Sequence, residues 1–269
     1  MNKLKYIIDL DGTIYNQNQL IPHADEFINY LIRIGRDFVI FTNSPEKSPW
    51  ELSQKLKTMR VHVNPDRIVT AGCITREYLL EQSTRHPVSA FVVGTRQLKD
   101  SFSQSGIEVI EGKSPIADFV VIGFEREFCY ETLRLACLHV FNGAGLIATN
   151  ADESIPTENG PIPHTGSLMA AVEYATGVKA LVLGKPETNT FSFLQKKLHC
   201  KRSELCIVGD RLDTDMKFGR LNRFKSFLVL TGMTKQDDLN LHSDLLFDQS
   251  FNSLLDVMNY DMQMNAESR

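Results

Sequence analysis

The chain has 269 residues, a length typical of one large domain or of two domains of ordinary size. Hydrophobic residues make up 42% and charged residues 23%, which is ordinary for a globular protein and excludes a fibrous or largely disordered chain. The formal net charge of −4 and the pI of about 6.0 argue against a nucleic-acid polymer as partner, because such binding needs a basic surface.

The cysteines and the apolar runs indicate the compartment. Five cysteines without CxxC spacing or a secretory context are expected to be reduced thiols. The N-terminal residues lead into a short apolar run without the long apolar segment of a signal peptide. No apolar run is long enough to span a bilayer. We therefore expect a cytoplasmic protein with no membrane partner.

The start of the chain alternates apolar runs with helical patterns. Residues 6–10 form an apolar run, and residues 24–34 follow with apolar positions at helical spacing. A second apolar run covers 38–41, and a helix is predicted over about 49–59. This is a strand-helix-strand-helix order.

The middle of the chain has a complete set of elements of its own. Strands are predicted at residues 90–93, 108–110, 119–122 and 146–148. Helices are predicted at residues 96–105, 130–141 and 167–176. These elements indicate a second α/β unit inserted into the first.

The first rhythm returns late in the chain. Strands are predicted at residues 180–183, 205–208, 227–230 and 245–247. A helix is predicted over about 190–198, and the polar residues from about Tyr260 predict a frayed end. Apolar runs without strict alternation, separated by helices, are typical of a parallel sheet covered on both faces. We therefore predict an α/β fold with a doubly wound parallel-sheet core over 1–78 and 183–269, and an inserted α/β domain over 79–182.

An aspartate pair follows the first predicted strand. Asp9 and Asp11 are two positions apart, so both carboxylates can point to the same side of the strand end. Two anions this close need a cation or a shared proton, and oxygen ligands suit Mg²⁺. An Asp-rich turn explains the same residues more simply. A calcium loop is a weaker alternative because the further acidic residues and helical flanks of that motif are missing.

Three more segments place polar residues where predicted strands end. Thr42-Asn43-Ser44 offers a hydroxyl and backbone amides to a phosphate oxygen, although capping turns use the same residues. Lys185 can offset the charge of aspartates and phosphate, although a lone lysine is more often a surface residue. Asp210 follows another strand and would complete a metal site at the same sheet edge.

The four segments, in this chain order, resemble the four motifs of the haloacid dehalogenase (HAD) superfamily, whose core is Rossmann-like. The α/β insertion between the second and third motifs resembles the cap of subfamily IIA, which includes p-nitrophenylphosphatase-like, phosphoglycolate and nucleotide phosphatases. Further similar segments are Thr149–Asp152, Pro156, Gly160, Pro163, Ala170–Gly177 and Gly184–Pro186. The chain departs from the pattern at Pro163-His164-Thr165-Gly166, where the family usually has a Pro-Gly pair.

The resemblance implies covalent phosphatase chemistry. Asp9 would attack phosphorus, and Asp11 would protonate the leaving oxygen and then activate water. The side chains of Asp9 and Asp210 and the backbone carbonyl of Asp11 would hold Mg²⁺. Asp215 is expected near the metal through water, or as a brace for other loops.

The resemblance also implies a phosphate-binding set and a substrate loop. Thr42, the Asn43 amide and Lys185 would bind the transferring phosphoryl group. Asn150 and His164 are candidates for the substrate loop of the cap, with ordinary turns as an equally good interpretation. Specificity would lie in such cap loops.

The expected substrate is a small phosphorylated metabolite, such as a sugar phosphate, a nucleoside monophosphate or a phosphoglycolate-like compound. Dimerisation through the cap is implied by the resemblance. A phosphomutase, a phosphoacceptor or binding module, and a scaffold that lost catalysis are the alternatives. Asp11 favours a phosphatase over a dehalogenase, which has no need of the second aspartate.

Overall fold

The computed structural model describes residues 4–82, 87–155, 157, 159–239 and 247–267. It divides into two compact units, each built around a parallel sheet, which confirms the predicted α/β class. Unit 1 comprises Met1–Thr42, Pro49–Val69 and Lys185–Arg269, and unit 2 comprises Asn43–Ser48 and Thr70–Gly184. Among the described helices, none combines the length and the apolar character that a bilayer-spanning segment needs.

The first sheet is six-stranded, with β1 between β13 and β4. Its strands, in spatial order, are β15 (Gln249–Phe251), β14 (Lys225–Val229), β13 (Leu205–Gly209), β1 (Lys5–Ile8), β4 (Phe38–Thr42) and β5 (Ile68–Thr70). Ile8 of β1 is in parallel register with Val208 of β13 on one side and Ile40 of β4 on the other. From β1 the chain continues to β4 and β5 on one side of that strand, and it later forms β13, β14 and β15 on the other side. Open α/β sheets bind ligands at the carboxyl ends of strands where the strand order reverses in this way.

The remaining elements of this part of the chain are mostly helices. They are α1 (Ala24–Arg33), α2 (Pro49–Thr58), α7 (Asn189–Leu198), α8 (Lys217–Asn222), α9 (Gln236–Leu239) and α10 (Leu254–Glu267), with 3₁₀ turns at Pro65–Arg67 and Arg202–Glu204, a π-helical turn at Leu212–Met216, and a hairpin of β2 (Tyr15–Asn16) and β3 (Gln19–Leu20). Buried side chains from the sheet and helices, among them Phe27, Phe38 and Phe227, form one apolar cluster. This packing holds the strand ends in place.

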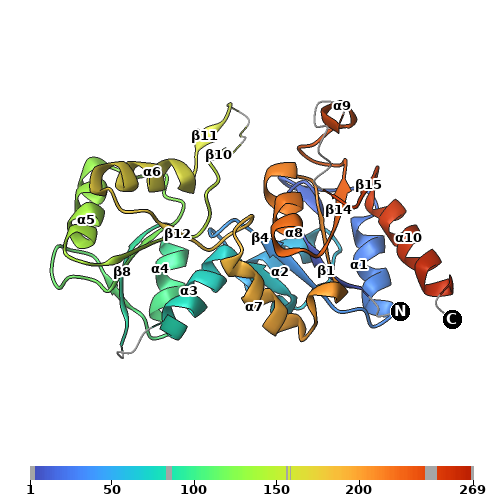
Figure 1. Ribbon diagram of the computed structural model, residues 1–269, viewed down its shortest axis with the longest axis horizontal. Helices are drawn as coiled ribbons and strands as arrows, with labels where there is room; N and C mark the ends of the chain where they lie inside the picture. Colours follow the sequence, from blue (N-terminus) through green and yellow to red (C-terminus); the bar gives the residue numbers. More distant parts are fainter. Residues whose placement is uncertain (1–3, 83–86, 156, 158, 240–246, 268–269) are drawn as a thin grey trace. The chain divides into compact units, whose positions relative to one another are not determined.

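The C-terminal segment forms the long helix α10, which lies beside α1 (Figure 1). The prediction of a frayed end from Tyr260 is therefore wrong. Asp261 is 4% exposed, and its carboxylate accepts hydrogen bonds from Tyr6 Oη and Tyr30 Oη at 2.7 Å each. Arg36 forms an ion pair with the same carboxylate at 2.9 Å. A polar residue that is buried by a distant partner leaves no local apolar pattern, so the sequence did not reveal the helix.

The strand predicted at 245–247 falls largely outside the described residues, because 245 and 246 are not described. The last described strand is β15. Several described elements were not predicted, among them the strand β5, the helix α3 (Ala71–Gln82) that directly follows it, and the helix α8.

Unit 2 has a five-stranded parallel sheet. Its spatial order is β12 (Leu181–Val182), β9 (Gly145–Ala148), β8 (Phe119–Ile122), β6 (Ser89–Val93) and β7 (Glu108–Ile110). The other elements are α3, α4 (Arg96–Ser103), α5 (Tyr130–Phe141), α6 (Thr165–Thr176) and the hairpin of β10 (Ser154–Ile155) and β11 (Ile162–Pro163). Helices α5 and α6 pack together on the apolar cluster of this unit (Figure 1). Every element predicted between residues 90 and 176 is present.

Candidate active site

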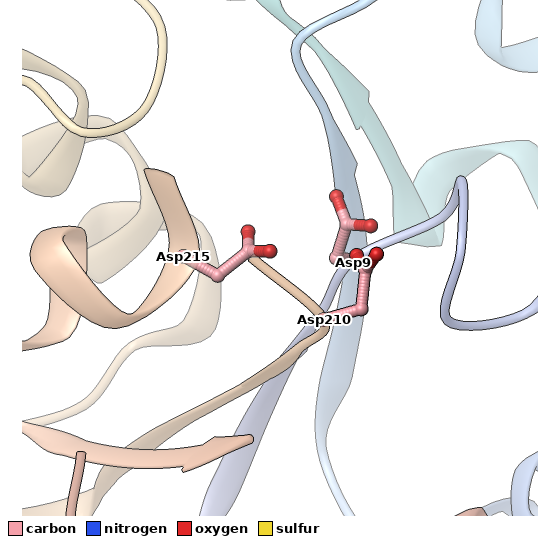
Figure 2. A group of neighbouring side chains, drawn as sticks. All are labelled: Asp9, Asp210 and Asp215. Atoms are coloured by element: carbon pink, nitrogen blue, oxygen red, sulfur yellow. The ribbon is translucent and has the colours of Figure 1, made fainter. Parts of the chain in front are cut away.

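Three aspartates meet at the carboxyl edge of the first sheet. Asp9 directly follows β1 and Asp210 directly follows β13, and the backbone N–H of Asp9 donates to Val208 O at 2.8 Å. Asp215 lies on the π-helical turn Leu212–Met216. One carboxylate oxygen from each aspartate lies within 4.8 Å of the others. Figure 2 shows the side chain of Asp215 extending toward those of Asp9 and Asp210.

Lys185 supplies positive charge to this cluster. Its Nζ donates to Asp9 Oδ1 at 2.5 Å, to Asp215 Oδ1 at 2.7 Å and to the carbonyl of Phe41 at 3.2 Å. The lysine is 2% exposed, so these bonds replace its hydration. Three carboxylates beside one ammonium leave the cluster negative when all groups are ionised. A buried excess of negative charge favours a bound cation.

Burial and the neighbouring charges shift the pKa values of the groups in this cluster. Burial raises the pKa of Asp9 well above its usual range; Lys185 opposes the shift, and the charges of Asp215 and Asp210 add to it. Burial also raises the pKa of Asp210 to about 6, with a further contribution from Asp215. Burial by itself would lower the pKa of Lys185, but the two carboxylates outweigh it and the pKa is raised. A divalent cation would reverse the shifts of the two aspartates by stabilising their carboxylates.

Two glycines beside Asp210 leave the space that its carboxylate occupies. A Cβ atom on Gly12 or on Gly232 would overlap the carboxylate of Asp210. Gly12 also has a φ of +85°, which other residues rarely adopt. Asp210 Oδ2 accepts the backbone N–H of Met233 at 2.6 Å. Its Oδ1 is buried without a hydrogen-bond partner among the described residues.

These features fit a hard divalent cation. The donors are oxygen atoms only, the charge is negative, and a buried carboxylate oxygen of Asp210 has no partner from the described protein. Mg²⁺ binds through one or two carboxylates and keeps several waters, which matches such a set. The residues that could hold the ion are therefore Asp9, Asp210 and Asp215.

The other predicted site residues of unit 1 lie nearby in the fold. Asp11 is exposed and forms a backbone bridge with Tyr15, and its side chain is not part of the three-aspartate cluster. Thr42 is the last residue of β4 and is buried. Because β4 is the neighbour of β1 in the sheet, Thr42 ends one strand and Asp9 directly follows the adjacent parallel strand. The structure thus brings four motifs to one sheet edge.

The predicted residues of unit 2 have internal partners. Asn43 is the first residue of that unit, and its side chain donates to the carboxylate of Asp152. Asn150 is fully buried and donates to the carbonyl of Asn43 at 2.9 Å. The ring of His164 is buried and stacks on Phe124 with centroids 4.6 Å apart.

The sequence interpretation missed the loop that follows β14. Thr231 Oγ1 donates to the carbonyl of Gly12 at 2.8 Å, and Gly232 and Met233 enclose the carboxylate of Asp210. A signal was available, because Thr231-Gly232 directly follows a predicted strand, as the aspartate pair does. Thr and Gly are so common in turns that this position alone is not informative.

A doubly wound α/β core with acidic residues and a lysine at adjacent strand ends defines a class of phosphoryl-transfer hydrolases. The sequence profile described as haloacid dehalogenase-like hydrolase matches residues 6–108, and a HAD-hydrolase-like profile matches residues 182–255. The chain belongs to the haloacid dehalogenase-like hydrolases, within the subfamily IIA phosphatases. The predicted family is confirmed.

Two relatives of known name are similar in sequence to the chain over most of their length. The chain is 35% identical over 235 residues to an acid sugar phosphatase of Staphylococcus epidermidis, covering 87% of this chain and 89% of the relative. It is 33% identical over 234 residues to a 5′-nucleotidase of Bacillus subtilis, covering 87% and 90%.

Solved structures show the same fold. A p-nitrophenyl phosphatase from Archaeoglobus fulgidus superposes with a TM-score of 0.90 at 28% identity, covering 97% of this chain and 100% of that one. A 4-nitrophenylphosphatase from Thermotoga maritima superposes with a TM-score of 0.88 at 36% identity, covering 96% and 97%. The chain is a phosphoric monoester hydrolase, as predicted.

Proposed function

We propose that this phosphatase hydrolyses small phosphorylated metabolites through an aspartyl-phosphate on Asp9, with Mg²⁺ held at the three-aspartate cluster. The observation that carries the proposal is the bond between Lys185 and Asp9 inside a buried, negatively charged site. The names of the relatives support sugar phosphates and nucleoside monophosphates as substrate classes, with phosphoglycolate-like compounds as a further class.

The reaction takes place in two displacements. A carboxylate oxygen of Asp9 attacks phosphorus, the bond from phosphorus to the ester oxygen breaks, and Asp11 gives its proton to the leaving alcohol. Water then attacks the aspartyl-phosphate while Asp11 takes the proton of that water, which releases phosphate and restores Asp9. Asp11 suits this work because its side chain is exposed, and a proton donor must reach a group that enters from solvent.

Other residues position the reacting groups. Lys185 orients the Asp9 carboxylate and offsets negative charge, and Asp215 braces Lys185 through their 2.7 Å ion pair. Thr42 and the Asn43 amide bind phosphoryl oxygens. Mg²⁺, when bound, would offset the charge of the phosphoryl group. We propose that the side chains of Asp9 and Asp210 and the backbone carbonyl of Asp11 hold it, with Asp215 as their neighbour.

The wider organisation is also a proposal. Residues 1–78 and 183–269 would form the catalytic core, and 79–182 the inserted cap. His164 belongs to the proposed substrate loop, whereas the internal hydrogen bonds of Asn150, the other candidate for that loop, favour a positional role. Dimerisation through the cap, a cytoplasmic location, and the lack of nucleic-acid and membrane partners belong to the same proposal.

The test is a phosphate-release screen. Sugar phosphates, nucleoside monophosphates, phosphoglycolate, pyridoxal phosphate and p-nitrophenyl phosphate are offered with Mg²⁺ and again with EDTA, and no bisphosphate activator is added. We expect Mg²⁺-dependent release by the wild type and none by Asp9→Asn. Acid-quenched wild-type protein should gain the mass of one phosphoryl group on the peptide that contains Asp9.

The matched control is Asp213→Asn. Asp213 belongs to the same motif as Asp210, but it is exposed and paired with Arg211 at 2.6 Å rather than with the cluster. This variant should keep the wild-type rate. Full activity in Asp9→Asn would overturn the covalent mechanism, and a requirement for a bisphosphate activator would favour a phosphomutase.

A further inference from the structure

The chain passes from one unit to the other at four points, and two of these passages adjoin residues of the proposed phosphate-binding set. Unit 1 gives way to unit 2 between Thr42 and Asn43, and unit 2 gives way to unit 1 between Gly184 and Lys185. Thr42 and Lys185 are therefore each joined by one peptide bond to a residue of unit 2. A shift of the backbone at Asn43 or Gly184 can therefore move Thr42 or Lys185.

Asn150 is hydrogen-bonded to the backbone at the first of these passages, between Thr42 and Asn43. Its Nδ2 donates to the carbonyl of Asn43 at 2.9 Å, and its Oδ1 accepts the backbone N–H of Asp152 at 3.0 Å. The carboxylate of Asp152 in turn accepts the side-chain amide of Asn43 at 3.3 and 3.4 Å. These bonds close a ring of three residues around the Asn43 backbone.

The second passage packs against the same residue. A Cβ atom on Gly184 would lie 2.9 Å from the Cβ of Asn150, 2.9 Å from Asn43 Oδ1 and 2.7 Å from the carbonyl oxygen of Thr149. Only a glycine allows the backbone to approach this closely. Asn43 and Gly184 are thus held together around one buried side chain.

The bonds of Asn150 argue against direct contact with substrate. Asn150 is 0% exposed, and Asn43, Asp152 and the hydroxyl of Thr149 use its donor and acceptor groups. With its amide nitrogen and oxygen engaged within the protein, Asn150 is better placed to position the backbone than to bind substrate.

We propose that Asn150 is a positioning residue for phosphoryl transfer. It fixes the backbone at both passages and, through the adjoining peptide bonds, sets the places of Thr42 and Lys185. The inference rests on the proposed roles of those two residues. Misplacement of reacting groups by about 1 Å can cost about 100-fold in rate, so a small backbone shift here is enough to be measured.

The test is Asn150→Asp in the full-length protein. The replacement keeps the size of the side chain and the acceptor for Asp152, but it exchanges the donor to Asn43 for a carboxylate oxygen. We expect kcat to fall by about 10- to 100-fold with p-nitrophenyl phosphate and with a sugar phosphate alike, and inhibition by orthovanadate to weaken by a similar factor. The fall in kcat should not depend on the leaving group, because Thr42 and Lys185 act on the phosphoryl group, which both substrates share.

The matched control is Asn222→Asp. Asn222 is 4% exposed and its Nδ2 donates to the carbonyl of Phe218 at 2.9 Å, so the change removes the same kind of buried bond elsewhere. This variant should lose stability but keep kcat. A second test variant, Gly184→Ala, disturbs the same junction without a new charge and should also lower kcat with both substrates. It decides the question if Asn150→Asp does not fold.

Three results would overturn the inference: an unchanged kcat in folded Asn150→Asp or Gly184→Ala, a loss confined to one substrate, or an equal loss of kcat in Asn222→Asp. Asp9→Asn separates this failure from that of the proposed mechanism. If Asp9→Asn is inactive while Asn150→Asp is unaffected, only the role of Asn150 is wrong. If Asp9→Asn stays active, the covalent mechanism is wrong.

Discussion

Nζ of Lys185 lies 2.5 Å from Oδ1 of Asp9, although 176 residues separate them in the chain. Both side chains are nearly inaccessible, and a second carboxylate, that of Asp215, holds the same ammonium at 2.7 Å. Burying charges is costly unless they are paired and hydrogen-bonded. The two bonds of Lys185 therefore keep the carboxylate of Asp9 oriented in a site that excludes most water.

Removing this ammonium should impair catalysis. We expect Lys185→Met to lower kcat by about 10²- to 10³-fold, because the charge that orients Asp9 is lost. The measurement is the steady-state rate at saturating Mg²⁺ and p-nitrophenyl phosphate. Lys179→Met is the control, since Lys179 also bonds a carboxylate at 2.7 Å but its side chain is 87% exposed. A Lys185→Met rate near that of the control would contradict the role.

Filling the space beside Asp210 should weaken metal binding. In Gly232→Ala the new Cβ would overlap the Asp210 carboxylate, so we expect Mg²⁺ to stabilise this variant much less than the wild type. For the wild type, a ligand at 100 times its Kd adds about 2.7 kcal/mol, which is readily seen as a rise in Tm. Gly112→Ala is the control, because a Cβ there meets nothing within 4 Å. An equal Mg²⁺-induced rise in Tm for both variants would show that the metal lies elsewhere.

The ion pair between Asp261 of α10 and Arg36 should contribute to the free energy of unfolding and not to catalysis. Asp261→Ala leaves Arg36 buried without its carboxylate, and such a change costs about 3–5 kcal/mol. Urea unfolding measures the loss, while kcat at low temperature should stay near the wild-type value. Glu131→Gln, which removes the exposed partner of Arg134, should leave the unfolding curve nearly unchanged. The double change Arg36→Met with Asp261→Leu should cost less than Asp261→Ala, because no buried charge is left unpaired.

The turn after α6 should contribute stability that depends on pH. Burial of Glu173 raises its pKa, but hydrogen bonds from Lys179 Nζ and the Ala180 N–H outweigh this, so the folded-state pKa lies below the usual 4.5. The contribution is thus fully present above about pH 4.5 and is lost as the pH falls through the lower folded-state pKa. Glu173→Gln should cost on the order of 1 kcal/mol at pH 7 and progressively less in acid. Paired unfolding curves at several pH values test this, and a difference that is independent of pH would refute it.

The sequence predicted most regular elements because their apolar residues are local signals. Helix α5 and strand β8 have the predicted bounds, since their periodicity and their turn residues agree. Helix α3 was missed because it directly follows β5, with no breaker between Thr70 and Ala71. Helix α10 was missed because Asp261 is buried by side chains more than 200 positions away.

The sequence by itself determined the fold class, the family and the order of Asp9, Thr42, Lys185 and Asp210. That was possible because the carboxyl ends of neighbouring parallel strands share one edge, so a position after a strand predicts a place in space. Only the tertiary structure decided which side chains touch there: the ion pair of Asp215 with Lys185, the glycines around Asp210, and the bond from Asn150 to the Asn43 backbone. Such contacts depend on the path of the backbone through loops and on packing between distant segments, and no local periodicity in the sequence records them.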